Sequence, residues 1–393
     1  MHMQMELANP SVTCCSSSAF TNRGTQPGLC HARHASISVL RHAGSAAHGQ
    51  QRSRRSLQIH ARDLNAVERG IRGYQYNASG AVKKVAEGKY ADNGSGGGNG
   101  TAYGLLAATS LAVAVTLAVA PHTVADIFFG SDAHPHDYLH EVLFRLVSVS
   151  WIGAAAQNLV NKAAAENNLL DDVVHRRANA SLSFFAANTV FVTLLTFIPN
   201  PIYPHPIINV PAAAGLEALA LGQWWVAGRN YAKYSEGIGA NPVKIIKSYL
   251  RDFSTLGQNS GLNSTIYAAL TAAFVFTGFA YQFAPAPTMN AIFGMAAEKG
   301  LEDTYLWQLI GGSIATCIAP IAYTQRDAAN ENNFSLPNKR TLMAGLAILS
   351  AAHVAVFLPL LNTDQSGPLL FPVGFVWGVS AVASTLIAVK PSE

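Results

Sequence analysis

Three polar side chains that could do chemistry stand inside long apolar runs of this sequence: Glu217, Asn188 and His353. A charged group in the lipid interior costs roughly 2.5–3.5 kcal/mol on insertion scales, so such residues usually face a bundle interior and mark a functional path. We predict that Glu217 is a protonatable carboxylate in a substrate or proton path, and that Asn188 and His353 complete a central polar site. The alternatives are a carboxyl group that is neutral or paired for packing, and a histidine that is hydrogen-bonded in the core.

A second candidate is the loop that contains His136 and His140. If a helix begins near His136, the two imidazoles lie at positions i and i+4 on one face, a spacing that can hold a transition metal. Asp137 and Glu141 could complete the coordination shell or orient the rings. A solvated helix cap has the same composition. Glu141 also precedes Arg145 by four residues, so these two can form a charge pair at the membrane edge.

Several chemistries have no motif in the chain. The sequence contains no GxxxxGK[ST] phosphate loop, no GxSxG nucleophile elbow and no paired Asp-rich motifs. Basic residues are spread over several segments, so we expect no nucleic-acid partner. Of the 4 cysteines only Cys317 lies beyond residue 62, which argues against a disulfide framework. The sequence identifies no cofactor.

The elements that must position these side chains are membrane-spanning helices. Half of the residues are hydrophobic, 12% are charged and the mean hydropathy is +0.20, whereas soluble domains contain roughly a quarter charged residues. A span needs roughly 17–25 apolar residues. Eight segments qualify, so the sequence predicts an all-α integral membrane protein: 103–120, 143–160, 182–198, 206–228, 265–284, 305–323, 342–361 and 368–389.

The distribution of positive charge supports this arrangement. With eight spans, both termini and the loops after the second, fourth and sixth spans share one side of the membrane. Seven of the 26 Lys and Arg residues lie before residue 63, and of the others only Arg145 and Lys299 fall on the opposite side. The positive-inside rule therefore predicts that the termini lie in the stroma or matrix.

The parts outside the spans have distinct compositions. Residues 1–62 are rich in Arg, Ser and Ala and contain one acidic residue, which is typical of an organellar transit peptide and favours a chloroplast over a mitochondrion. Residues 63–100 are predicted to be a stromal segment that ends in a Gly-rich flexible tether at 91–100. Residues 229–262 are predicted to connect two halves, with an amphipathic surface helix at 241–251.

The chain also repeats itself. APHTVADIFFG at 120–130 returns as APAPTMNAIFG at 284–294, an offset of 164. Because other matches follow in the same order, residues 101–228 and 263–393 are predicted to be parallel copies of one four-helix unit. Those matches are LFRL at 143–146 with LWQL at 306–309, AENN at 165–168 with NENN at 330–333, AAN at 186–188 with AAH at 351–353, and VP at 210–211 with FP at 371–372.

Parallel repeats of this kind occur in transporters, whose substrate sites lie near the bilayer midplane. We therefore predict a secondary transporter or channel for a small solute or ion, with membrane lipid and possible other membrane proteins as partners. The alternative is a non-catalytic assembly or scaffold factor of a thylakoid or envelope membrane. A membrane enzyme or cofactor-binding protein, which would use His136, His140 or His353 as ligands, is a third class. We expect no enzymatic activity in the first two classes.

Overall fold

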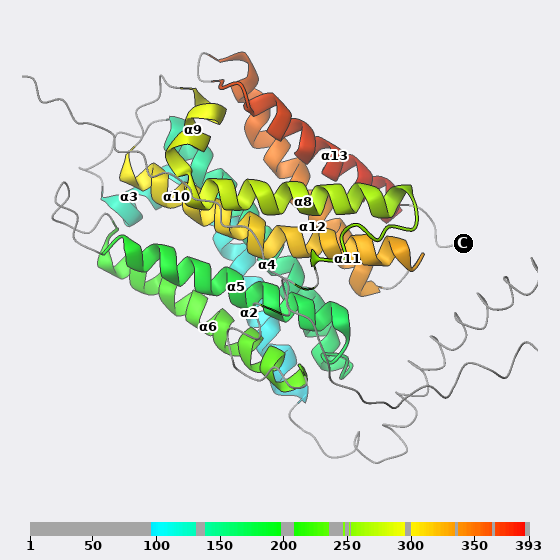
Figure 1. The fold of residues 1–393 in the computed structure, drawn as a ribbon. Helices are drawn as coiled ribbons and strands as arrows, with labels where there is room; N and C mark the ends of the chain where they lie inside the picture. The colour runs from blue at the N-terminus through cyan, green and yellow to red at the C-terminus, as the bar shows by residue number, and fades with distance from the viewer. Residues whose placement is uncertain are drawn as a thin grey trace, which may run out of the picture. The chain divides into compact units, whose positions relative to one another are not determined.

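The computed structural model describes residues 96–130, 138–197, 208–235, 247, 251, 253–294, 300–334, 337–363 and 366–389. Within these ranges the chain is helical and contains no strand, and the helices belong to a unit that spans residues 92–393. The first half consists of α2 (Gly96–Val119), α3 (Pro121–Phe129), α4 (Tyr138–Glu166), α5 (Val173–Leu195) and α6 (Val210–Tyr234) (Figure 1). The second half consists of α8 (Leu262–Phe283), α9 (Pro285–Phe293), α10 (Leu301–Ser313), η1 (Ile314–Ile318), α11 (Ala319–Asn330), α12 (Pro337–Phe357), η2 (Leu358–Asn362) and α13 (Leu370–Val389).

Seven helical segments of the described ranges are long and apolar enough to cross a membrane. They are α2, α4, α5, α8, the continuous segment Leu301–Asn330, the segment Pro337–Leu361, and α13. The predicted all-α membrane class is confirmed at this level. The fourth predicted span corresponds to α6, which has 25 residues but is not among the seven. The polar residues Glu217 and Gln223 lower its hydropathy.

The first helix begins earlier than its sequence predicts. α2 starts at Gly96, inside the 91–100 segment whose composition is that of a flexible tether. Glycine disfavours a helix by roughly 1 kcal/mol relative to alanine, so tertiary packing overrides the local preference here. α2 packs along α4, and β-carbons built on Gly100 and Gly104 would lie 3.0 Å and 3.3 Å from side-chain carbons of that helix. The glycines thus allow the close approach.

Three predicted segments lie wholly or mostly outside the described residues. They are the leader at 1–62, the stromal segment up to residue 95 and, apart from Lys247 and Arg251, the amphipathic helix at 241–251.

The long segment from α10 to α11 contains a π-helical turn, Ile314–Ile318. Pro320 lacks a backbone N–H and its ring crowds the carbonyl four residues earlier, which belongs to Thr316. Side chains of the first half satisfy the carbonyl groups of this turn: Ser181 Oγ donates to the Thr316 oxygen at 2.7 Å, and Gln157 Nε2 donates to the Cys317 oxygen at 3.0 Å. A proline is tolerated in an apolar helix where neighbours supply such bonds.

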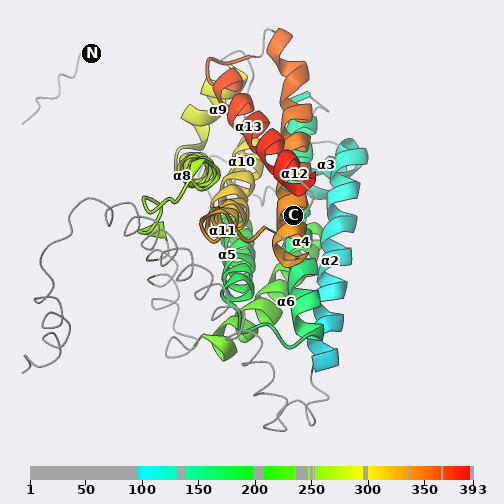
Figure 2. The same cartoon turned by 90° about the vertical axis from the view of Figure 1, so that its right-hand side faces the viewer.

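Packing joins equivalent-looking pairs of helices in each half. In the first half, α2 lies along α4, and α5 lies along α6. In the second half, α8 lies along both α10 and α11, and α12 lies along α13 (Figures 1 and 2). Between the halves, α4 contacts α10 and α12, and α10 contacts α5. α8 and α10 cross closely, because a β-carbon on Gly278 or Gly311 would lie 2.6 or 2.7 Å from atoms of the facing helix.

The short helices α3 and α9 follow the first span of each half in the same way. Each has a proline in its first turn, after Ala120 (φ −127°, ψ 51°) and Ala284 (φ −131°, ψ 56°). Each ends at a glycine with positive φ, Gly130 (93°) and Gly294 (75°). α3 and α9 lie toward the same end of the helices (Figure 2).

Candidate functional site

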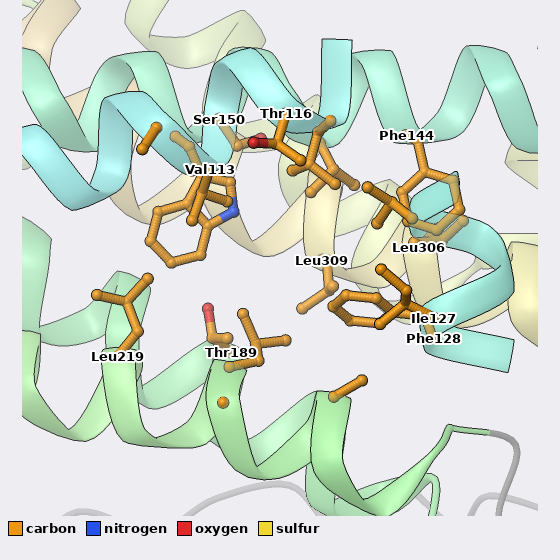
Figure 3. Close-up of a pocket in the computed structure, with 18 of the residues that line it drawn as sticks. Val113, Thr116, Ile127, Phe128, Phe144, Ser150, Thr189, Leu219, Leu306 and Leu309 are labelled. Atoms are coloured by element: carbon orange, nitrogen blue, oxygen red, sulfur yellow. The ribbon is translucent and has the colours of Figure 1, made fainter. Parts of the chain in front are cut away.

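The main cavity of the described residues has a volume of about 410 Å³. Its wall is formed by α2, α3, α4, α5 and α6 of the first half together with α10 of the second half. Figure 3 shows Val113 and Thr116 on one side of this space, Leu219 and Thr189 on the other, and Leu309 between them. Most of the lining side chains are aliphatic or aromatic, so the cavity favours an apolar occupant.

The mouth of the cavity lies between α2 and α6. The exposed lining residues are Thr109, Ala112 and Thr116 of α2, Pro211 and Gly215 of α6, and Ile127 of α3. A β-carbon built on Gly215 meets no atom within 4 Å. The two helices therefore stand apart along this stretch.

Ser150, Thr189 and Tyr305 are three of the five lining residues that carry a hydroxyl group. Ser150 Oγ lies 2.5 Å from Ser313 Oγ, and Thr189 Oγ1 donates to the Phe185 carbonyl oxygen at 3.0 Å. The Tyr305 hydroxyl lies 3.2 Å from Thr193 Oγ1. A hydroxyl oxygen that donates to a neighbour still has lone pairs that can accept a hydrogen bond. The wall can therefore hold one polar group of a ligand.

Glu217 stands beside the cavity rather than in its wall. It lies on α6 between the lining residues Leu216 and Leu219. Its Oε1 atom is buried and has no hydrogen-bond partner among the described residues. Tyr305, a lining residue of α10, lies within electrostatic range of this carboxyl group.

The other two residues of the predicted polar site have separate surroundings. Asn188 on α5 packs against the backbone of Gly312 on α10, where no side chain has room. His353 lies between α12 and α13, stacked on Trp377 at 3.7 Å between ring centroids and 7° between planes. His353 Nδ1 lies 3.1 Å from the Leu349 carbonyl oxygen. Among the described contacts, Asn188 lies against α10, and none joins Glu217 or Asn188 to His353. Their grouping into one site stays a prediction.

The predicted metal site is divided by the described ranges. His136 and Asp137 lie outside them. His140 is buried at the start of α4, and its Nε2 atom lies 3.6 Å from Asp303 Oδ1 of α10. No group of three or more potential metal-binding side chains gathers among the residues that are described. His140 thus has a carboxylate neighbour from the second half, and the metal hypothesis stays a prediction.

The two other charged residues of that region contact each other. Arg145 Nη2 lies 2.5 Å from Glu141 Oε1, and His122 Nε2 lies 3.8 Å from Glu141 Oε2. Both Glu141 and Arg145 retain solvent access, so the pair contributes on the order of 0–1 kcal/mol.

No protein-family model and no curated protein matches this chain. Its function is therefore inferred from the cavity and the groups around it.

Sequence patterns did not identify a buried amide network on the first half. The Tyr103 hydroxyl donates to Asn179 Oδ1 at 2.5 Å and accepts from Asn230 Nδ2 at 2.9 Å, while Asn161 Nδ2 donates to Asn179 Oδ1 at 3.0 Å. All four residues are buried. They connect α2, α4, α5 and α6, and the signal for them in the sequence is the presence of asparagines inside apolar runs.

A second unpredicted feature is a charged cluster between α5 and α11. Asp327 accepts from Arg177 at 2.9 Å and from Arg326 at 2.7 Å. The Arg177 guanidinium carbon lies 4.3 Å from the centroid of the Tyr323 ring, a geometry that favours cation–π attraction. Both arginines are buried. The cluster joins the two halves, and no local sequence pattern reveals it because its members are about 150 residues apart.

Proposed function

We propose that this protein is a secondary transporter for a small solute, built from two parallel copies of a four-helix unit. The observation that carries the proposal is the cavity: it lies in the first half, yet its wall includes Tyr305, Leu306 and Leu309 of the second half. Transporters built from parallel repeats bind their substrates where the repeats meet. A movement between the halves would reshape such a wall.

Contacts between corresponding residues support the duplication. His140 lies 3.6 Å from Asp303, and Ser150 lies 2.5 Å from Ser313. Both pairs have a separation of 163 residues, the offset at which LFRL matches LWQL. Residues related by a twofold axis touch each other where the axis passes between them. We therefore place a pseudo-twofold axis between α4 and α10.

Backbone geometry supports the same duplication. Asn168 and Asn332 are the non-glycine residues with positive φ, at 54° and 53°, in the described ranges. The amide of Leu169 donates to the Ala164 oxygen and the amide of Asn333 donates to the Ala328 oxygen, both at 2.8 Å. This match has an offset of 164, one residue less than the letters AENN and NENN suggest.

The π-helical turn accounts for a change in the sequence separation between corresponding residues of the two copies. Corresponding residues are 163 apart at Ser150 and Ser313, and 164 apart at Asn168 and Asn332. One additional residue therefore enters the second copy between these points, where Ile314–Ile318 is wound as a π-helix. A π-helical turn accommodates a single inserted residue without breaking the helix.

We further propose that α6 is the eighth span. Its 25 residues extend about 37 Å at 1.5 Å per residue, enough for a bilayer core of about 30 Å. It packs along α5 as α13 packs along α12. An even number of spans places both termini on one side, and the leader composition and the distribution of Lys and Arg favour a chloroplast membrane with this side in the stroma.

The two copies differ at the place where a solute would bind. With an offset of 164, His353 corresponds to Thr189 of the cavity wall rather than to Asn188, and Phe274 corresponds to Ser110. In the second half, Phe274 and His353 both stack on Trp377, with ring centroids 4.5 Å and 3.7 Å from that of the indole. Large rings thus occupy space that smaller side chains leave open in the first half. The first copy is the solute-binding one in this proposal.

Glu217 is the proposed coupling residue. A carboxyl group beside an apolar cavity can bind and release a proton as its surroundings change. Solute movement would then follow the proton gradient.

The test is proton flux into liposomes that contain the full chain and a trapped pH-sensitive dye, driven by a potassium diffusion potential. We expect wild-type protein to admit protons and Glu217→Gln to fall to the rate of protein-free liposomes. The matched control is Glu166→Gln, because Glu166 is an exposed carboxylate paired with Lys162, and it should retain the wild-type rate.

A wild-type rate equal to that of empty liposomes, or an undiminished rate for Glu217→Gln with unchanged thermal stability, would overturn the transporter proposal. The scaffold function would then be the better explanation, and a pull-down through residues 63–100 would test it.

A further inference from the structure

We propose that the cavity binds a neutral lipophile, with a hydrocarbon body of about a dozen carbon atoms and one hydroxyl group, that enters from the bilayer between α2 and α6. This inference rests on the proposed function for its site. It goes further by naming the class of ligand and its route.

The size and chemistry of the wall select the body of the ligand. A volume of about 410 Å³ holds roughly 14 groups the size of a water molecule, which occupies about 30 Å³ in the liquid. The wall is built largely from Val113, Phe144, Leu219, Leu306 and Leu309 and similar side chains. Apolar cavities do not retain water but do accept hydrocarbons.

The absence of charged side chains from the cavity lining disfavours an ion as the ligand. None of the residues that line the cavity is an Asp, Glu, Lys, Arg or His. An ion that left water for this space would lose its hydration without gaining a partner. A neutral molecule avoids that cost.

The hydroxyl groups of the wall select the polar end. Thr189 and Tyr305 already contact Phe185 and Thr193, and Ser150 contacts Ser313. The remaining lone pairs of these oxygens can accept a hydrogen bond from a ligand hydroxyl. Figure 3 shows Ser150 and Thr189 on opposite sides of the space, so a group between them can reach either.

The position of the mouth indicates how a ligand enters the cavity. Thr109, Ala112 and Thr116 on α2 face Pro211 and Gly215 on α6, and all five are exposed. α2 is one of the candidate spans, so this opening meets the acyl-chain region of a bilayer rather than water. A lipophile concentrated in the membrane can enter without crossing the aqueous phase.

The experiment uses dodecanol that carries a photoreactive diazirine on its chain, with the full chain in lipid nanodiscs. We expect adducts on cavity peptides of α2, α6 and α10, and loss of these adducts with excess unlabelled dodecanol. Gly215→Phe places a ring in the open mouth and should reduce labelling at least about tenfold. Gly222→Phe is the matched control, because Gly222 lies on the same helix, also has no atom within 4 Å of a β-carbon, and does not line the cavity.

A second pair of probes tests the polar end. Thr189→Val should lower the preference for the alcohol over a diazirine-labelled dodecane by about two- to tenfold, the value of one hydrogen bond. An equal preference of wild type for alcohol and alkane would overturn the hydroxyl assignment.

A diazirine-labelled phosphatidylcholine tests whether the hydrocarbon in the cavity is an acyl chain of a bilayer lipid. If this lipid labels the cavity and dodecanol does not compete, the space holds a bilayer acyl chain and the proposal fails. Labelling at equal levels in Gly215→Phe and wild type would overturn it as well. If dodecanol competes for labelling but the protein admits no protons, the ligand inference stands and the transporter proposal fails. If the protein admits protons but the cavity is not labelled, the transporter proposal stands and the ligand inference fails.

Discussion

At the scale of single residues, Gly312 shows how the two halves depend on small side chains. A β-carbon built on Gly312 collides with the side-chain amide of Asn188 on α5. Gly312 is buried in α10, so an added methyl group must push the Asn188 amide aside. Asn188 therefore contributes to the fit of α5 against α10 as well as being a candidate for the solute path.

Gly312→Ala should lower the free energy of unfolding by about 1–3 kcal/mol, the usual cost of overpacking a core. The measurement is chemical unfolding of the purified protein in detergent. Asn188→Ala in the same chain should restore part of the loss, because it removes the colliding amide. Gly222→Ala should cause no loss, since a β-carbon there has open space. A neutral Gly312→Ala would contradict the packing described for these helices.

At the scale of elements, the π-helical turn depends on donors from another helix. Two carbonyl groups of this turn, those of Thr316 and Cys317, accept hydrogen bonds from Ser181 on α5 and Gln157 on α4. The turn thus contributes to how the second half sits against the first, close to the contact of Ser150 and Ser313.

Ser181→Ala should lower the free energy of unfolding by about 0.5–1.5 kcal/mol, because it removes the hydrogen bond that Ser181 donates to the Thr316 oxygen. Thermal unfolding followed by circular dichroism would measure the change. Ser183→Ala is the control, since Ser183 Oγ donates to the Asn179 carbonyl of its own helix and should change stability by less. Equal effects of the two substitutions would show that the bond to Thr316 carries no special weight.

At the scale of the whole helical unit, contacts between α4 and α10 define the relation of the halves. Ser150 and Ser313 hold their oxygens 2.5 Å apart, a distance that brings the β-carbons within the usual reach of a disulfide. Each half otherwise pairs its helices in the same order.

Ser150→Cys with Ser313→Cys should form a disulfide under a membrane-permeable oxidant in a chain whose native cysteines are replaced by serine. Mass spectrometry of the cross-linked peptide pair would detect it. Ser148→Cys with Ser313→Cys is the control, because Ser148 Oγ contacts the Arg145 carbonyl of its own helix instead. Cross-linking of the control pair at the same yield would argue against the axis proposed between α4 and α10.

The amino-acid sequence alone determined the class and much of the architecture of this protein. Long apolar runs with few charges predict membrane helices because unpaired polar groups are costly in lipid. The prediction placed α2, α4, α5, α8, α10 with α11, α12 and α13, and helix ends moved by several residues where packing prevailed, as at Gly96. The sequence also singled out Glu217, because an acidic residue in an apolar run is conspicuous without any knowledge of its neighbours.

Only the tertiary structure decided what surrounds these residues. The cavity depends on the space left between helices, and the bond from Ser181 to Thr316 and the pairing of Arg177 with Asp327 join segments more than 100 residues apart. Local periodicity and composition report which face of a helix is apolar. They do not report which side chains of two distant helices meet, because that depends on the volumes of every residue between them.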